Sequence, residues 1–155
     1  PDTESLKDTY ERVMKFYIDE IQEKLNIFAA SWAAHGKGLT ACASVVYDRF
    51  LILLVDEEKH AASGCSIDSS VHFIKEIEQT FQVNLFNRLL IAYQADNQIK
   101  TVDMASFKKM ATAGKITANT FVFNNMISSK SELENKWLVP VTESWHKQLL
   151  PKVFS

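Results

Sequence analysis

The first 35 residues carry a hydrophobic stripe that constrains this chain more than any other feature. Large apolar side chains recur at steps of three and four over residues 6–32, which places them on one face of a helix. No Gly or Pro interrupts residues 2–35, and Gly36 supplies a C-terminal stop. The pattern predicts one long helix, or two collinear helices with a break near Asp19, where Asp19 and Gln22 form a capping pair.

The long helix has two interpretations. Its stripe stays close to a seven-residue repeat over nearly three heptads, so it could pair with a second copy and make the protein a homodimer. It could instead pack across the sheet of its own domain, as amphipathic helices of globular proteins do. We favour packing within the domain and keep the homodimer as the alternative.

Two strands follow this helix. Residues 39–47 alternate between small or apolar side chains and more polar ones, which predicts a strand with one covered face. Residues 50–55 are all apolar, which predicts a central strand covered on both faces. Because only Asp48 and Arg49 separate the two runs, we expect a β-hairpin.

Capping residues predict three short helices in the second half of the chain. Asp103 can cap a helix that Gly114 stops. Ser131 and Glu134 have the spacing of a capping box for the next helix. Thr142 is the expected cap of the last one.

The remaining segments decide the fold class. Apolar spacing predicts a helix over residues 67–81, and short apolar runs predict strands at residues 89–93, 99–102 and 120–123. This order predicts an α+β fold, with a small, mostly antiparallel sheet of about four or five strands flanked by helices. We expect a single domain over residues 1–155.

Composition excludes several classes of protein. The chain has 155 residues, of which 46% are hydrophobic and 23% charged, and this suits one folded domain. Nucleic-acid binders need a basic face, whereas the net charge here is -2. The densest basic cluster is Lys108, Lys109 and Lys115, which we interpret as a solvated helix surface. The composition therefore disfavours nucleic acid as a partner.

The two cysteines, Cys42 and Cys65, indicate the compartment. Cys42 lies in an apolar, strand-like run and no secretory signal precedes it, so we expect reduced thiols and a cytoplasmic protein. No stretch approaches the roughly 20 apolar residues that span a bilayer. We therefore expect no membrane partner.

One apolar strand end resembles a nucleotide-hydrolysis motif. Residues 53–57, Leu-Leu-Val-Asp-Glu, match a Walker B strand, in which Asp holds magnesium and Glu polarises water. That chemistry also needs a glycine-rich phosphate cradle between a strand and a helix. The Gly36-Lys37 pair has the wrong spacing for such a cradle and follows a helix. ATPase activity is therefore not expected, and we lean away from an enzyme.

Residues 64–69, Gly-Cys-Ser-Ile-Asp-Ser, are the strongest candidate for a site. A thiol at a helix start lies at the positive end of the helix dipole, which favours a nucleophilic thiolate. The free backbone N–H groups and serine hydroxyls there would suit a small anionic ligand such as phosphate or carboxylate. The ligand-binding candidates are therefore Gly64, Cys65, Ser66, Asp68, Ser69 and Asp56, and the catalytic candidates are Cys65, Asp68 and His72.

Geometry limits what these residues can do together. Cys65 and His72 are roughly 10 Å apart along a helix axis, so they cannot form a nucleophile–base pair. Asp68 and His72, four residues apart, can touch, yet Asp68 would repel an anion at the helix start. The alternative interpretation is structural, with Ser66 or Asp68 as the helix cap and His72 solvated. We predict no metal site, because no close pair of Cys or His ligands is present, and we identify no cofactor.

Several short motifs resemble a known family. They are residues 32–36 (Trp-Ala-Ala-His-Gly), 55–57 (Val-Asp-Glu), 123–125 (Phe-Asn-Asn), 144–146 (Ser-Trp-His) and, above all, 62–75 (Ala-Ser-Gly-Cys-Ser-Ile-Asp-Ser-Ser-Val-His-Phe-Ile-Lys). With them, residues 28–93 resemble a family of small, functionally uncharacterised bacterial proteins. Some relatives carry the label ABC transporter ATPase. The resemblance implies no established reaction.

Three functional hypotheses follow. The leading one is a small cytosolic binding or adaptor domain without catalysis. The second is an enzyme that uses Cys65, or an acid–base or metal cluster of Asp56, Asp68 and His72. The third is a homo-oligomeric structural module built on the first helix.

Overall fold

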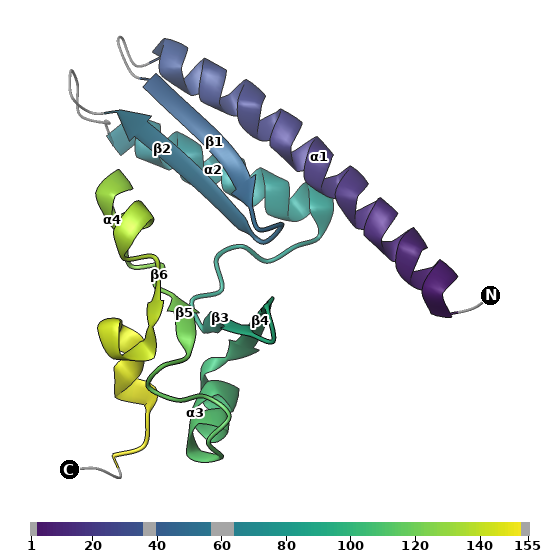
Figure 1. Cartoon of the computed structure of the whole chain (residues 1–155). Coiled ribbons are helices and arrows are strands. Elements are labelled where there is room, and N and C mark those ends of the chain that lie inside the picture. Colours follow the sequence, from purple (N-terminus) through teal and green to yellow (C-terminus); the bar gives the residue numbers. More distant parts are fainter. Residues whose placement is uncertain (1–2, 36–39, 57–63, 153–155) are drawn as a thin grey trace. The chain divides into compact units, whose positions relative to one another are not determined.

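A computed structural model describes residues 3–35, 40–56 and 64–152 (Figure 1). The chain divides into two compact units, Pro1–Leu85 and Phe86–Ser155, here called the N-terminal and C-terminal units. Each unit combines helices with an antiparallel sheet, which confirms the α+β fold. The single domain predicted over residues 1–155 stays a prediction, because division into compact units does not decide whether they unfold together.

The N-terminal unit starts with one long helix. α1 runs without a break over Thr3–His35, so the long helix is confirmed and the alternative of two collinear pieces is wrong. Gln22 does not form a cap with Asp19. Its side chain instead accepts a hydrogen bond from Val45 N–H at 2.9 Å and donates one to the Ala43 carbonyl at 3.1 Å. Gln22 thus satisfies backbone groups on strand β1 (Thr40–Val46).

The predicted hairpin is confirmed. β1 pairs antiparallel with β2 (Phe50–Asp56), and Tyr47 and Asp48 in the turn both have left-handed backbone, with φ of 55° and 57°. Two such residues are typical of the tight turn that matches strand twist. β2 was expected to be a central strand, but in the described part of the chain its partner is β1 alone, and its apolar side chains are half-buried.

Helices α1 and α2 (Gly64–Phe81) pack on the hairpin face that carries Ala43. The core of this unit is small: Leu25, Ala29 and Ala43 are buried, and half-buried Phe73 of α2 packs against them. The Phe73 ring stacks on Phe28 of α1, with centroids 4.3 Å apart. This stack joins the two helices and fixes which face of α2 points outward.

The C-terminal unit is built on a four-stranded antiparallel sheet with the order β4-β3-β5-β6. The strands are β3 (Leu90–Ala95), β4 (Gln98–Asp103), β5 (Phe121–Phe123) and β6 (Leu138–Pro140). β4, predicted as a strand over residues 99–102, lies at one edge of this sheet, and β6 was not predicted from the sequence. The helical segments are α3 (Met104–Thr112), α4 (Lys130–Asn135) and two short 3-10 helices, η1 (Val141–Glu143) and η2 (Trp145–Leu149).

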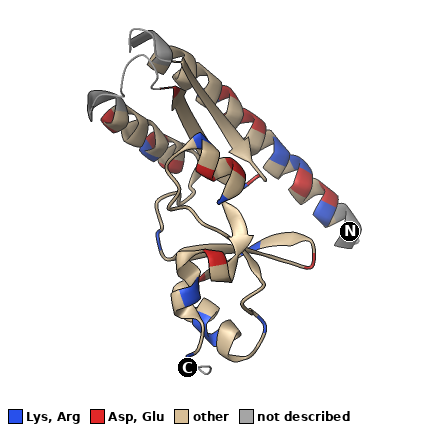
Figure 2. Ribbon diagram, turned by 60° about the vertical axis from the view of Figure 1, so that its left-hand side comes forward, with Lys and Arg blue, Asp and Glu red and all other residues tan. Residues whose placement is uncertain are grey.

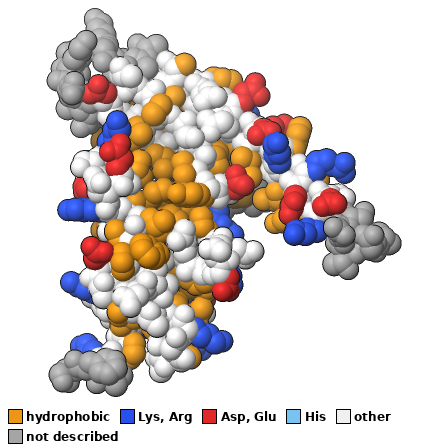
Figure 3. All heavy atoms as spheres, viewed as in Figure 1, with side chains coloured by type: hydrophobic (Ala, Val, Ile, Leu, Met, Phe, Trp, Pro, Cys, Tyr) orange, Lys and Arg blue, Asp and Glu red, His pale blue; other side chains and the backbone are white. Residues whose placement is uncertain are grey.

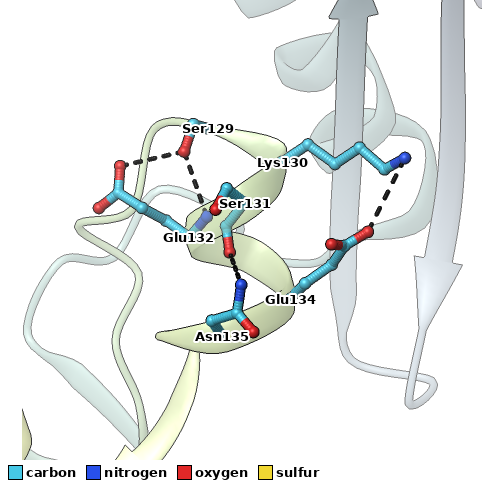
Figure 4. A network of polar contacts seen from close by, with 6 residues as sticks. All are labelled: Ser129, Lys130, Ser131, Glu132, Glu134 and Asn135. Carbon is cyan, nitrogen blue, oxygen red and sulfur yellow. Dashed lines mark hydrogen bonds and ion pairs between the residues drawn. The ribbon is translucent and has the colours of Figure 1, made fainter.

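The caps of these helices agree in part with the predictions. Asp103 caps α3 by accepting the Ser106 N–H at 2.7 Å, and this hydrogen bond lowers the pKa of its carboxyl group. At α4 the cap is Ser129, whose hydroxyl accepts the Glu132 N–H at 3.2 Å and reaches the Glu132 carboxylate at 3.3 Å (Figure 4). The predicted pair Ser131 and Glu134 has the same spacing, so the pattern alone cannot choose between the two.

The capping residue of the last helix also differs from the predicted one. Ser144, not Thr142, caps η2, and its hydroxyl accepts the His146 N–H at 3.1 Å. Among the described residues, no helix is both long and apolar enough to cross a membrane.

Gly114, which was predicted to stop α3, has left-handed backbone with φ of 79°. Gly114→Ala is expected to lower the free energy of unfolding by about 1 kcal/mol, because a Cβ is strained in this conformation. No neighbouring heavy atom lies within 4 Å of the added Cβ, so the cost comes from the backbone. Urea unfolding of the full chain measures it. Gly114→Asn is the control and should cost less, because Asn tolerates this conformation; equal costs would contradict the explanation.

Candidate functional site

The candidate site is an open groove along the outward face of α2 and the chain that follows it. Its cavity volume is about 770 Å³. The groove is lined by polar and charged side chains with one apolar exception: His72, Lys75, Glu76, Glu78, Gln79, Gln82, Val83 and Asn84. α2 is amphipathic. Its apolar face places Ile74 and Ile77 in the interior, and its polar face therefore points outward.

Glu78 holds the end of the groove in place. Gln82 has left-handed backbone, φ 54°, and ends the helix. The Val83 N–H then donates to the Glu78 carbonyl at 3.2 Å, and the Leu85 N–H donates to the Glu78 carboxylate at 2.6 Å. The chain is thereby folded back beside the last turn of α2, so that Val83 and Asn84 form a wall.

His72 is the titratable ring in the groove. Its Nε2 lies 3.2 Å from Glu76 Oε1, and both side chains are largely exposed. If Nε2–H donates to this carboxylate, Nδ1 keeps its lone pair available. Lys75 lies on the same lining and supplies a positive charge for an anion. The groove therefore holds an oriented imidazole beside a cation.

The predicted pairing of Asp68 with His72 is replaced by the pair of His72 with Glu76. Both acids lie four residues from His72, and the longer Glu side chain makes the contact. Asp68 is exposed one turn earlier on α2. His72, Lys75, Glu76 and Gln79 share the groove face of α2, and Glu76 was not predicted from the sequence as the partner of His72.

The other predicted site residues lie elsewhere. Asp56 is the exposed last residue of β2, opposite Thr40 in the hairpin register. Ser69 is exposed on α2. Gly64, Cys65 and Ser66 open this helix, and their side chains lie outside the described residues.

The proposed cluster of Asp56, Asp68 and His72 is tested only as a metal site. Within the described part of the chain, no group of three or more His, Cys, Asp or Glu side chains could hold a metal ion. An acid–base role for Asp56, Asp68 and His72 stays a prediction.

A second histidine is buried in the C-terminal unit. His146 is 1% exposed, stacks on Trp145 with centroids 3.9 Å apart, and contacts the ring of Phe107. Its Nδ1 lies 2.7 Å from Ser144 Oγ. Burial lowers the pKa of His146 from 6.5 to about 4. This serine–histidine pair is inaccessible to a substrate and supports the fold.

The buried His146 makes stability depend on pH. Its folded-state pKa lies below the unfolded value, so the unfolded chain binds more protons between pH 6.5 and about 4. The contribution of His146 to the free energy of unfolding is therefore fully present above pH 6.5. It falls as the pH drops, and about 2 kcal/mol is lost at pH 5. Urea unfolding at a series of pH values measures the loss. His146→Phe should show a shallower dependence; parallel curves for the two proteins would contradict the assignment.

Comparison with known proteins yields a partial match to an enzyme. A 51-residue stretch is 57% identical to a 2,3-bisphosphoglycerate-dependent phosphoglycerate mutase of Pelagibacter ubique (strain HTCC1062). The match covers 30% of this chain and 20% of the mutase, so the chain spans about a fifth of that relative's length. No family model matches the chain. No solved structure matches it either.

The match corrects the leading functional hypothesis. A binding or adaptor domain without catalysis was expected, because the sequence holds no complete catalytic motif. Identity of 57% with part of a mutase contradicts that expectation and favours an enzyme. The signal is spread over 51 residues, so a search for short motifs could not find it.

Proposed function

We propose that this protein transfers phosphoryl groups on small phosphorylated carboxylic acids. The observation that carries the proposal is the 57% identity, over 51 residues, with an enzyme whose name gives phosphoglycerate as its substrate and 2,3-bisphosphoglycerate as its requirement. Such compounds combine phosphate with carboxylate. They are small anions, the ligand class that the sequence analysis favoured.

The α2 groove supports this chemistry. His72 Nδ1 would attack the phosphorus of a bound phosphate ester, forming an N–P bond while the ester P–O bond breaks and the departing oxygen takes a proton from water. Glu76, 3.2 Å from Nε2, would stabilise the positive charge that the ring acquires. Passing the phosphoryl group to a second hydroxyl of the acid reverses these steps and completes a mutase reaction.

Lys75 and the amides would hold the ligand. The ammonium group of Lys75 can neutralise a phosphate or carboxylate, and the side-chain amides of Gln79, Gln82 and Asn84 can donate hydrogen bonds. The helix start at residues 64–69 remains our proposal for a second anion contact, because its backbone N–H groups point out of the first turn.

Two further expectations stay as proposals. A cytoplasmic location is supported by the free, exposed thiol of Cys42, since thiols persist in reducing compartments. Membership of the small bacterial family is supported by the motifs of residues 62–75.

The test is a direct assay of the full chain. Purified protein is incubated with 3-phosphoglycerate and 2,3-bisphosphoglycerate, and phosphorus NMR follows the appearance of 2-phosphoglycerate and inorganic phosphate. We expect turnover above the protein-free control, together with an acid-labile phosphohistidine on the protein. Neither product nor phosphohistidine after long incubation would reject the proposal.

A further inference from the structure

The end of the α2 groove that lies farther along the helix from His72 is formed by the segment after the helix. Val83 and Asn84 lie in this segment, and both are exposed. Figure 2 shows acidic and basic residues along α2, whereas Figure 3 shows hydrophobic side chains gathered over the hairpin. A charged ligand is therefore better matched by α2 than by the hairpin surface.

Glu78 attaches this segment to the helix. Its side chain is half-buried, its carbonyl accepts the Val83 N–H at 3.2 Å, and its carboxylate accepts the Leu85 N–H at 2.6 Å. A hydrogen bond to a carboxylate is stronger than one to a carbonyl. Gln82, which precedes Val83, has φ of 54°, a conformation that is disfavoured for a residue with a Cβ. The contacts of Glu78 therefore hold the chain in a shape that it would not favour alone.

These contacts set how far Asn84 lies from His72. Because the Leu85 N–H meets the Glu78 side chain, Asn84 lies beside α2 near the level of Glu78. Glu78 is six residues beyond His72, which is about 9 Å along the helix axis. In an extended three-carbon acid phosphate, the phosphorus and the carboxyl carbon are about 5 Å apart, and a hydrogen bond adds about 3 Å at the far end. Such a ligand is long enough to reach from His72 to Asn84.

We infer that Asn84 binds the end of the substrate that carries the carboxylate, and that Glu78 is a positioning residue for Asn84. This role depends on the proposed function, in which His72 takes the phosphoryl group. The side-chain NH2 of Asn84 donates a hydrogen bond to a carboxylate oxygen, while Lys75 neutralises negative charge. Glu78 acts through the Leu85 N–H and does not touch the substrate.

Glu78→Ala in the full chain tests this role. Loss of the Leu85 contact releases Asn84, so KM for 3-phosphoglycerate should rise about 10-fold while kcat changes less than about twofold. Asn84→Ala should give the same pattern. Inorganic phosphate occupies the His72 end alone, so its inhibition constant should change less than about twofold in both variants. Phosphorus NMR of the conversion of 3-phosphoglycerate to 2-phosphoglycerate gives these constants.

Two controls separate the hydrogen bond from charge and from folding. Glu78→Gln removes the charge but keeps a side-chain oxygen that can accept the Leu85 N–H, so KM should rise less than about threefold. Glu23→Ala changes an exposed residue of α1 outside the groove lining and should alter neither constant. Urea unfolding checks that every variant is folded in the assay. Asn84→Ala, at an exposed residue, decides the point if Glu78→Ala does not fold.

Four results would overturn the role of Glu78 and Asn84 while leaving the proposed function intact. They are equal KM values for Glu78→Gln and Glu78→Ala, an inhibition constant of phosphate that rises as much as KM, an unchanged KM for Asn84→Ala, and a loss of kcat without a rise of KM in Glu78→Ala. If the wild-type chain forms neither 2-phosphoglycerate nor phosphohistidine, the proposed function fails, and this role fails with it.

Discussion

His72→Asn is expected to lower the rate of phosphoryl transfer by roughly 1,000-fold or more. Asn keeps a polar side chain of similar reach but offers no ring nitrogen to accept the phosphoryl group. The fold should be unaffected, because the His72 side chain is 78% exposed and its ion-pair partner, Glu76, is 61% exposed. Phosphorus NMR of the mutase reaction gives the rate, and the phosphohistidine signal should vanish with it.

Two control variants separate chemistry from folding. Thr80→Ala changes an exposed residue of α2 outside the groove lining and should leave the rate unchanged. Glu76→Gln keeps the shape of the His72 partner but removes its charge, and should cost about 10-fold if the carboxylate stabilises the charged ring. Full activity of His72→Asn would reject His72 as the phosphoryl acceptor while leaving the enzyme class open.

The elements set by local pattern were predictable. α1 follows from a stripe that no Gly or Pro interrupts, and the hairpin follows from two apolar runs separated by Asp48 and Arg49. The α3 boundaries follow from Asp103, whose carboxylate accepts the first-turn N–H of Ser106, and from Gly114, whose φ is positive. In each case the residues that create the signal also make the stabilising contact.

Features set by partners distant in sequence were not predictable. β6 is only three residues long and includes Pro140. It is a strand because it pairs with Phe121–Phe123 of β5. Residues 50–55 have the composition of a central strand, but composition does not indicate how many strands lie beside them in the sheet. The far wall of the groove depends on Glu78 accepting the Leu85 N–H, a contact between a helix and the chain after it.

The candidate site shows the same limit within a single helix. Helical spacing makes Asp68 and Glu76 equal neighbours of His72, and the pattern cannot tell which side chain reaches the ring. The structure selects Glu76, at 3.2 Å. This choice matters chemically, because it moves the charged partner toward Lys75, Gln79 and the rest of the groove.

Phe107→Ala is expected to be among the most destabilising single changes in the chain, by about 3–5 kcal/mol. The Phe107 side chain is fully buried on α3 and belongs to the same core cluster as Ile91, Val122 and Val141. Truncation to Ala removes most of a ring and leaves a cavity, whose cost adds to the lost burial. Native domains have only about 5–15 kcal/mol of stability, so a large share would be lost. Urea unfolding at pH 7.5 measures the change.

Phe107→Leu is the matched control, since it keeps most of the volume and should cost about 1–1.5 kcal/mol. The ring of Phe107 also lies 5.9 Å from that of His146. The cavity left by Ala should admit water beside the imidazole, raise the pKa of His146 toward its ordinary value, and weaken the dependence of stability on pH below 6.5. A loss under about 1 kcal/mol for Phe107→Ala, or an unchanged pH dependence, would show that this core repacks around the missing ring.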